Sequence, residues 1–158
     1  YNFKINLRKI NFLDDDNIKI HNGFYQQVFR DKFYYKVINF IKSLNNKNYL
    51  LFFSGHSLGG VMASLFGYFS SFIFIDNKII IISFGSCKIG NKYFQESFNN
   101  KNNIICYRVI NNNDIIINLP IIKYEHIGIP IKLSSNNNFD LIDNHKYETY
   151  LKNLLNSK

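Results

Sequence analysis

Cysteines are scarce in this sequence, and no apolar run is long enough to cross a membrane. The two cysteines in 158 residues, Cys87 and Cys106, are too few for a disulfide scaffold, and their spacing does not suit zinc binding. We expect both to be free, buried thiols. The apolar run KIIIISFG at 78–85 is far shorter than the roughly 20 residues that a membrane-spanning helix needs. It is typical of a buried strand instead.

The first residues lack an initiator methionine and the pattern of a signal peptide. We therefore expect the chain to be a fragment. Its 158 residues, 46% of them hydrophobic, are enough for one sizeable core and too few for two ordinary domains. We predict a single domain over residues 1–158, incomplete on its N-terminal side.

Acidic residues are outnumbered by basic ones, 11 against 19, which gives a formal net charge of +8. An anionic surface is therefore an expected partner, either phospholipid headgroups or nucleic acid. The lysines are scattered, however, and the aromatic residues have core-like spacing instead of alternating with a basic run. This distribution argues against nucleic acid and favours peripheral contact with an anionic membrane or lipid surface.

Apolar runs with the character of strands alternate along the chain with segments of helical period. Because each later strand is almost continuously apolar, we predict an α/β fold with a mostly parallel sheet and helices on both faces. One or two short strands are expected within residues 1–20. The further predicted strands are 49–55, 78–85, 104–110 and a segment near 126–133; the predicted helices begin near Gly23, Leu58, Asn91 and His145.

The first of these helices is predicted to run without a break from Gly23 to the NNKN segment at 45–48. Its apolar side chains recur at helical spacing and are expected to share one buried face. They are Phe24, Val28, Phe29, Phe33, Val37, Phe40, Ile41 and Leu44.

The stretch GHSLG at 55–59 has the pattern G-x-S-x-G between a predicted strand and a predicted helix. Such a tight turn needs small residues on both sides of the serine, here Gly55 and Gly59. Ser57 would stand at a helix N-terminus, and the Leu58 N–H would donate into an oxyanion hole. A glycine-rich turn also suits phosphate. No lysine follows the glycines and no G-x-G-x-x-G is present, so the nucleophile interpretation is favoured.

A nucleophilic serine needs an acid and a base, which α/β-hydrolases supply in the order Ser, Asp or Glu, then His. Asp114 follows the strand at 104–110 in a polar loop, where a parallel sheet presents acids at its active edge. Taken alone, it would be a turn residue in an Asn-rich loop. Asp76 precedes a strand and belongs to the opposite edge. The remaining aspartates after the serine are Asp140 and Asp143.

Two histidines follow the serine, His126 and His145. His145 comes after the last predicted strand, where a loop can reach over the active edge. His126 lies at the start of a strand, where a structural role is the commoner one. We therefore favour His145 as the base.

Five ordered segments resemble the class 3 lipases, the fungal-lipase-like family of α/β-hydrolases, along nearly the whole chain. The family patterns that they resemble are H-x-G-F, the nucleophile elbow, F-G-x-P-x-x-G-N, R-V-x-N-x-x-D-x-V-x-x-L-P and Y-x-H-x-G. The matching segments are HNGFYQQV at 21–28, GHSLGG at 55–60, FGSCKIGN at 84–91, RVINNNDIIINLP at 108–120 and YEHIGIPI at 124–131. Together they are far more specific than one pentapeptide.

The resemblance implies an α/β-hydrolase fold in which Ser57 is the nucleophile, Asp114 the acid and His145 the base. The histidine of the family pattern D-H-x-x-Y is matched by His145 in NHKY. His56 would support the nucleophile elbow, and His126 would be the family's non-catalytic strand histidine. The implied reaction is hydrolysis of acylglycerols or other lipid esters through an acyl-enzyme, without metal or cofactor.

The sequence departs from the family in three places. Cys87 stands where the family usually has proline, and the interval from Asp114 to His145 is shorter than in secreted fungal members. An upstream F-R-G-T segment, which supplies a second oxyanion donor, and the lid after it are not present. We expect the N-terminal strands of the family to be lacking, with a substitute role for YNFKINL at 1–7 or weak activity as alternatives.

The leading function is therefore a serine lipase or esterase. The alternative is a weakly active or inactive hydrolase domain that binds lipid or a protein partner through the same cleft. Within the enzyme class, acyltransferase, thioesterase and peptidase chemistry stay open, because a triad does not choose the acyl acceptor.

Overall fold

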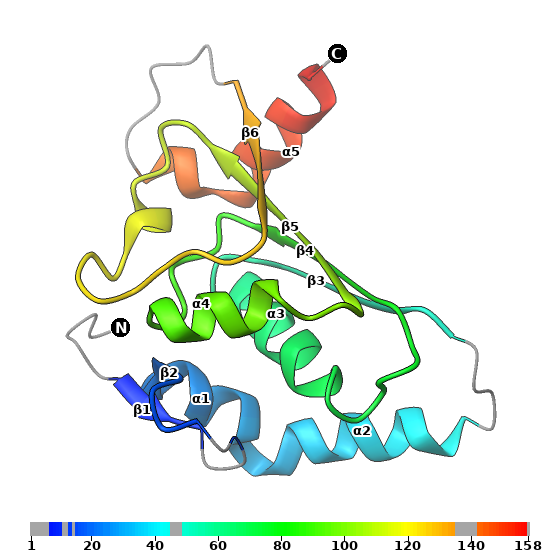
Figure 1. Cartoon of the computed structure of the whole chain (residues 1–158). Helices are drawn as coiled ribbons and strands as arrows, with labels where there is room; N and C mark the ends of the chain where they lie inside the picture. The colour runs from blue at the N-terminus through cyan, green and yellow to red at the C-terminus, as the bar shows by residue number, and fades with distance from the viewer. Residues whose placement is uncertain (1–6, 11–12, 14, 45–48, 135–141, 158) are drawn as a thin grey trace.

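A parallel sheet forms the centre of the molecule. The computed structural model describes residues 7–10, 13, 15–44, 49–134 and 142–157. Within these residues the sheet has the strand order β3-β4-β5-β6, which is also the order along the chain (Figure 1). Its strands are β3 (Leu51–His56), β4 (Ile79–Phe84), β5 (Ile104–Asn111) and β6 (Ile129–Leu133). All are parallel to their neighbours, so their carboxyl ends meet at one edge.

Strand β4 explains why both faces of the sheet must be covered. Ile79 and Ile81 are fully buried, and the alternate residues Ile80 and Ile82 are half-buried. Successive side chains point to opposite faces, so an unbroken isoleucine run gives each face an apolar surface. The α/β class predicted from the sequence is therefore confirmed.

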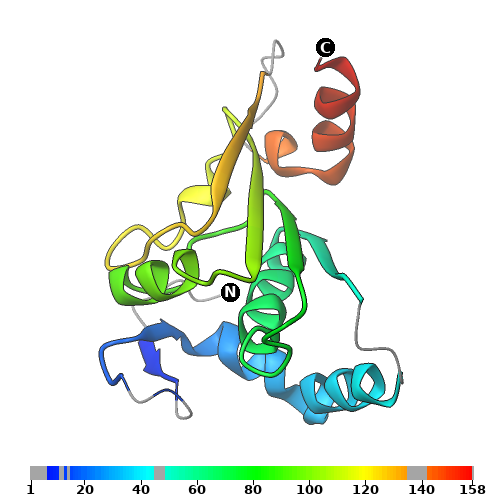
Figure 2. The same ribbon diagram turned by 45° about the vertical axis from the view of Figure 1, so that its right-hand side comes forward.

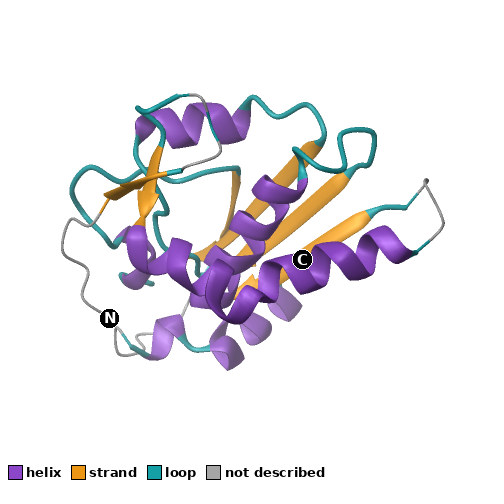
Figure 3. Cartoon of the chain, turned by 90° about the horizontal axis from the view of Figure 1, so that it is seen from below, coloured by secondary structure: helices purple, strands orange, loops and turns teal. Residues whose placement is uncertain are grey.

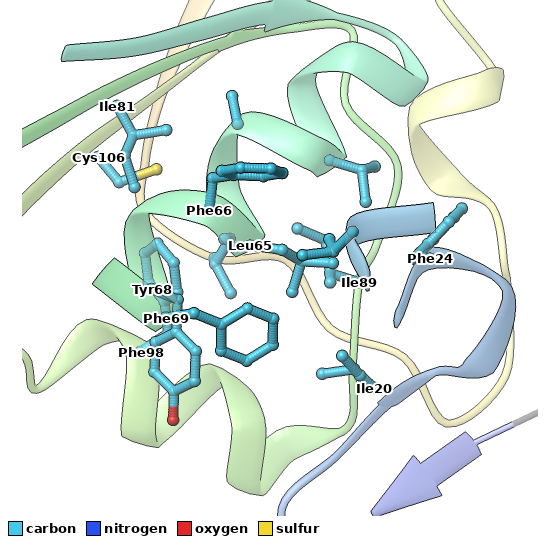
Figure 4. Packing of buried hydrophobic residues seen from close by; sticks show 14 of the residues in the cluster. Ile20, Phe24, Leu65, Phe66, Tyr68, Phe69, Ile81, Ile89, Phe98 and Cys106 are labelled. Carbon is cyan, nitrogen blue, oxygen red and sulfur yellow. The ribbon is translucent and has the colours of Figure 1, made fainter. Parts of the chain in front are cut away.

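One face carries the main hydrophobic core. It is packed by α3 (Leu58–Ser70), which is buried along almost its whole length. Around α3 lie α1 (Asn22–Phe29), α2 (Phe33–Ser43) and α4. Figure 4 shows Leu65, Phe66, Tyr68 and Phe69 of α3 side by side with residues such as Ile89 and Phe98. The N-cap of α4 (Lys92–Asn99) is Asn91, whose side chain accepts from the Phe94 N–H.

The other face carries a much smaller cluster under α5 (Tyr147–Asn156). Its buried members are Val109 of β5, Leu133 of β6 and Tyr150 of α5. Strands β5 and β6 contribute these residues near their carboxyl ends, and Figure 2 shows α5 beside those upper ends of the sheet. Helices thus lie on both faces, as the sequence predicts, but very unequally.

The prediction of a single helix from Gly23 to Leu44 is wrong. The structure has α1 (Asn22–Phe29), a short 3-10 segment (Arg30–Lys32) and α2 (Phe33–Ser43). Asp31 and Lys32 adopt left-handed φ angles of 52° and 58°, which reset the helical phase between the two helices. Helix α2 therefore buries Tyr34, Ile38 and Ile41. Three residues predicted to be buried are exposed instead: Phe33 (54%), Phe40 (64%) and Leu44 (47%).

A separate antiparallel pair is formed by β1 (Leu7–Lys9) and β2 (Lys19–His21). This pair agrees with the short strands expected in the first 20 residues, and Figure 3 shows it apart from the main sheet. Among the described residues, no helix combines the length and apolar character needed to span a membrane.

Candidate active site

Ser57 lies at the carboxyl end of β3, between the strand and the first residue of α3. Its φ of 55° and ψ of −122° are strained for a residue with a side chain. Backbone hydrogen bonds hold this conformation: the Ser57 N–H donates to Phe84 O at 2.8 Å, and Ser57 O accepts from the N–H groups of Gly60 and Val61. The turn therefore lifts the hydroxyl above the carboxyl edge of the sheet.

The glycines of the turn differ in what they allow. A Cβ on Gly55 would lie 2.3 Å from the carbonyl carbon and oxygen of Gly59, and a Cβ on Gly60 would lie 3.0 Å from Gly55 O. Apart from its chain neighbours and the backbone of α3, a Cβ on Gly59 would meet no described atom within 4 Å. In the described part of the chain, neighbouring backbone atoms thus leave no room for a side chain at Gly55 or Gly60. The expectation that Gly59 is needed for space is not met there, because Gly59 is exposed on the first turn of α3.

His145 joins Ser57 to Asp114. Its Nε2 lies 2.7 Å from Ser57 Oγ, and its Nδ1 lies 2.8 Å from Asp114 Oδ2. Since the carboxylate accepts, Nδ1 carries the hydrogen and Nε2 is left to accept from the serine hydroxyl. The structure therefore brings together the three residues that the sequence singled out, from segments 31 and 88 positions apart in the chain.

Asp114 is 1% exposed, and its two oxygens have separate partners. Oδ1 accepts from the Ile116 N–H at 2.9 Å, which is the turn geometry considered as the alternative for this residue. Oδ2 faces His145. The two interpretations of Asp114 are thus compatible, because the turn holds one oxygen and leaves the other directed at the histidine.

Tyr150 is a member of the site that the sequence reasoning missed. Its hydroxyl donates to Asp114 Oδ2 at 2.7 Å and accepts from the Asn111 N–H at 3.2 Å. Gly85, with φ of 59°, leaves room for this contact, since a Cβ there would lie 3.1 Å from the Tyr150 hydroxyl. Burial is the main cause of a strongly raised Tyr150 pKa, so the phenol stays protonated and remains a donor. The sequence signal was a tyrosine after the histidine, but the NHKY match points to Tyr147, which is exposed.

His56, expected to support the elbow, also contacts the segment that carries His145. Its Nε2 lies 2.7 Å from His145 O, and because a carbonyl only accepts, this nitrogen carries a hydrogen. Burial lowers the pKa of His56, while the hydrogen bond to the His145 carbonyl acts in the opposite direction without reversing the shift. His56 is consequently a neutral donor to a backbone carbonyl.

The other candidates lie away from the hydroxyl of Ser57. Asp76 is exposed and precedes β4, at the opposite edge. Asp143 pairs with Lys146, and Asp140 lies outside the described residues, as does most of the YNFKINL segment. His126 is half-buried before β6, and its carbonyl accepts from Gln95. Burial, with the charges of Arg108 and Lys88, lowers the pKa of His126 to about 3.

The two thiols are free and buried, as expected. Cys87, at the position of the family proline, donates to Ile116 O, next to the Asp114 turn. Burial raises the pKa of Cys87 to about 11 and that of Cys106 to about 12, so neither is a thiolate at neutral pH. Over the described part of the chain, no group of three or more His, Cys, Asp or Glu side chains is arranged to hold a metal ion.

Comparison with known proteins places this geometry in a family. Residues 1–124 match the family described as lipase (class 3). None of the curated proteins compared with the chain matches it.

Several solved structures share the fold. Lipase II from Rhizopus niveus superposes with a TM-score of 0.71 at 23% identity, over 85% of this chain and 51% of its own. A triacylglycerol lipase from Penicillium expansum has a TM-score of 0.69 at 20% identity, and the match covers 84% of this chain and 54% of the lipase. A third, a triacylglycerol lipase whose catalytic centre is described as a serine protease triad, gives 0.68 at 20% identity, over 84% and 52%. The chain spans about half the length of the lipases that it matches.

Proposed function

Because the chain belongs to the class 3 lipase family, we propose that it hydrolyses carboxylic esters of lipids through an acyl-enzyme. The observation that carries the proposal is the hydrogen-bonded series from Asp114 Oδ2 through His145 to Ser57 Oγ. This is the arrangement of nucleophile, base and orienting acid that acyl transfer from an ester to water requires.

In the first half of the reaction, Ser57 Oγ attacks the carbonyl carbon of the ester while His145 Nε2 accepts the hydroxyl proton. Asp114 holds the imidazole with Nδ1 protonated and stabilises the imidazolium that forms. The tetrahedral intermediate collapses when His145 returns the proton to the leaving alcohol, which leaves an acyl group on Ser57. Water then repeats the sequence and releases the acid.

Charge develops on the carbonyl oxygen during each attack, and the N-terminus of α3 is suited to stabilise it. The N–H of Leu58, the first residue of this 13-residue helix, is the proposed oxyanion donor. Gly55 and Gly60 allow the strand and helix to approach closely enough to form the turn that presents it.

Lipid esters are the proposed substrates because two of the matched structures are described as triacylglycerol lipases. The surface of the chain also suits a lipid interface. Phe33 and Phe40 of α2 and Leu44, the residue after it, are exposed. Phe33 also lines an apolar groove between α2, β3 and α3 that extends to Gly59, two residues past Ser57. Because the whole chain has a formal net charge of +8, this surface is expected to contact anionic lipid. Sedimentation with phosphatidylglycerol vesicles, compared with phosphatidylcholine vesicles, tests the contact.

A fluorophosphonate probe tests the chemistry, since it reacts only with an activated serine. Labelling of the wild type that disappears in Ser57→Ala supports the hydrolase, and Ser54→Ala, an exposed serine of β3, is the matched control. A folded wild type that takes up no probe would contradict the proposal and favour the alternative of a lipid- or protein-binding domain.

A further inference from the structure

The base of the proposed triad is not carried by the sheet. His145 ends a short 3-10 segment (Asp143–His145) that follows β6 and precedes α5. The ring accepts a hydrogen bond from Ser57 and donates one to Asp114, and these bonds orient the imidazole. They do not fix the backbone from which the ring projects. A three-residue segment has little rigidity of its own, so other groups must hold it.

Two successive carbonyls of this segment are bound by side chains from the sheet. His56, the last residue of β3, donates from Nε2 to His145 O at 2.7 Å. Asn111, the last residue of β5, donates from Nδ2 to Asn144 O at 3.0 Å. We propose that His56 and Asn111 are positioning residues for His145, which together fix the backbone of the base against the carboxyl edge of the sheet. The inference rests on the proposed function for the role of His145.

Both donors are themselves held in place. Asn111 is fully buried, and its Oδ1 accepts from Asn153 of α5 at 3.0 Å. The ring of His56 lies 5.0 Å from that of His145 and 5.6 Å from that of Tyr150, centroid to centroid. A donor that is fixed by its own contacts loses little freedom when it binds a carbonyl, which makes it effective at positioning.

The position of His56 next to Ser57 links the nucleophile to the base. His56 is bonded directly to Ser57, so the residue that presents the nucleophile also contacts the backbone of the base, 89 positions later. A displacement of one therefore moves the other with it. The same contact excludes His56 as an alternative base through Nε2, because that nitrogen already donates to a carbonyl.

Three substitutions separate positioning from packing. His56→Gln retains an N–H donor that can reach the His145 carbonyl, His56→Asn retains a donor that is too short, and His56→Leu retains the bulk without a donor. Since a misplacement near 1 Å costs up to about 100-fold in rate, we expect kcat on a short p-nitrophenyl ester to fall roughly 10- to 100-fold in the Leu and Asn variants. KM should change little, and His56→Gln should recover most of kcat. Unfolding midpoints of all three show whether the fold is intact.

A second readout does not depend on turnover. The downfield proton resonance of His145 Nδ1, bonded to Asp114, should be sharp in the wild type and in His56→Gln and broadened or lost in His56→Leu and His56→Asn. If the wild type hydrolyses no ester but the resonance follows this pattern, the proposed function fails and the positioning role stands. If the resonance and kcat are unchanged in the folded Leu or Asn variant, the positioning role is wrong.

Discussion

The Tyr150 hydroxyl lies 2.7 Å from Asp114 Oδ2, the same carboxylate oxygen that lies 2.8 Å from His145 Nδ1. One buried oxygen therefore accepts two hydrogen bonds, one from His145 and one from Tyr150 of α5. With the Ile116 N–H on Oδ1, these donors hold Asp114, which is 1% exposed.

Tyr150→Phe removes this donor and also leaves the buried Asn111 N–H without its acceptor at 3.2 Å. We expect a loss of about 1–3 kcal/mol in the free energy of unfolding, measured by urea denaturation. We also expect kcat to fall roughly 10-fold, because one orienting contact of about 1.4 kcal/mol is lost. Tyr147→Phe, at an exposed tyrosine of the same helix, should change neither quantity.

Asp114→Asn should lower kcat for a short p-nitrophenyl ester by about 10⁴-fold, because an amide no longer selects the His145 tautomer that accepts from Ser57. His145→Ala should suppress turnover as strongly. Asp143→Asn is the control, since Asp143 pairs with Lys146 near the surface. A folded Asp114→Asn protein with nearly wild-type turnover would show that another group orients the base.

Alanine should have very different effects on stability at the two glycines of the GHSLG stretch. Gly55→Ala places a Cβ 2.3 Å from Gly59 backbone atoms, so we expect a loss of several kcal/mol or failure to fold. Gly59→Ala meets no described atom within 4 Å and adds a good helix former to α3. It should change stability by no more than about 1 kcal/mol. Thermal unfolding of the two variants side by side measures the difference, and equal destabilisation would contradict this account of the turn.

His126 should make the protein less stable in acid. Its folded-state pKa of about 3 lies below the ordinary histidine pKa of 6.5, so the unfolded chain binds the proton first as the pH falls. The stabilisation is complete above pH 6.5 and is lost progressively down to about pH 3, with a limiting slope of about 1.4 kcal/mol per pH unit. His126→Gln should flatten this dependence in urea denaturation. Turnover should survive in folded His126→Ala, and its loss there but not in His145→Ala would overturn the choice of base.

Residues that act through short-range chain geometry were predictable from the sequence. The turn at Ser57 follows from small residues between an apolar strand and an apolar helix, and the place of Asp114 follows from the direction of parallel strands. Tyr150 was not predictable in this way. Whether Tyr147 or Tyr150 faces Asp114 depends on where α5 begins and on its helical phase, and NHKY alone does not determine either.

The break between α1 and α2 was also not predictable from the sequence. Left-handed residues are usually recognised by glycine or asparagine, whereas here they are Asp31 and Lys32. The apolar period of the sequence runs across the break, so it predicted that Phe33, Phe40 and Leu44 would be buried together with Ile41. Of these four residues, Ile41 alone is buried. The different roles of Gly55 and Gly59 also depend on tertiary neighbours that a pentapeptide does not specify.

The two faces of the sheet are covered unequally. The residues of the proposed active site therefore stand on parts of the molecule that differ in how readily they unfold locally. Ser57 stands on β3 and α3, which belong to the large core, whereas His145 is attached to α5, whose burial depends on the small cluster of Val109, Leu133 and Tyr150. Segments with little buried apolar surface open first under mild denaturant. Undocking of α5 would separate the base from the nucleophile while the sheet stays folded, so activity is expected to disappear at a lower urea concentration than the strands do.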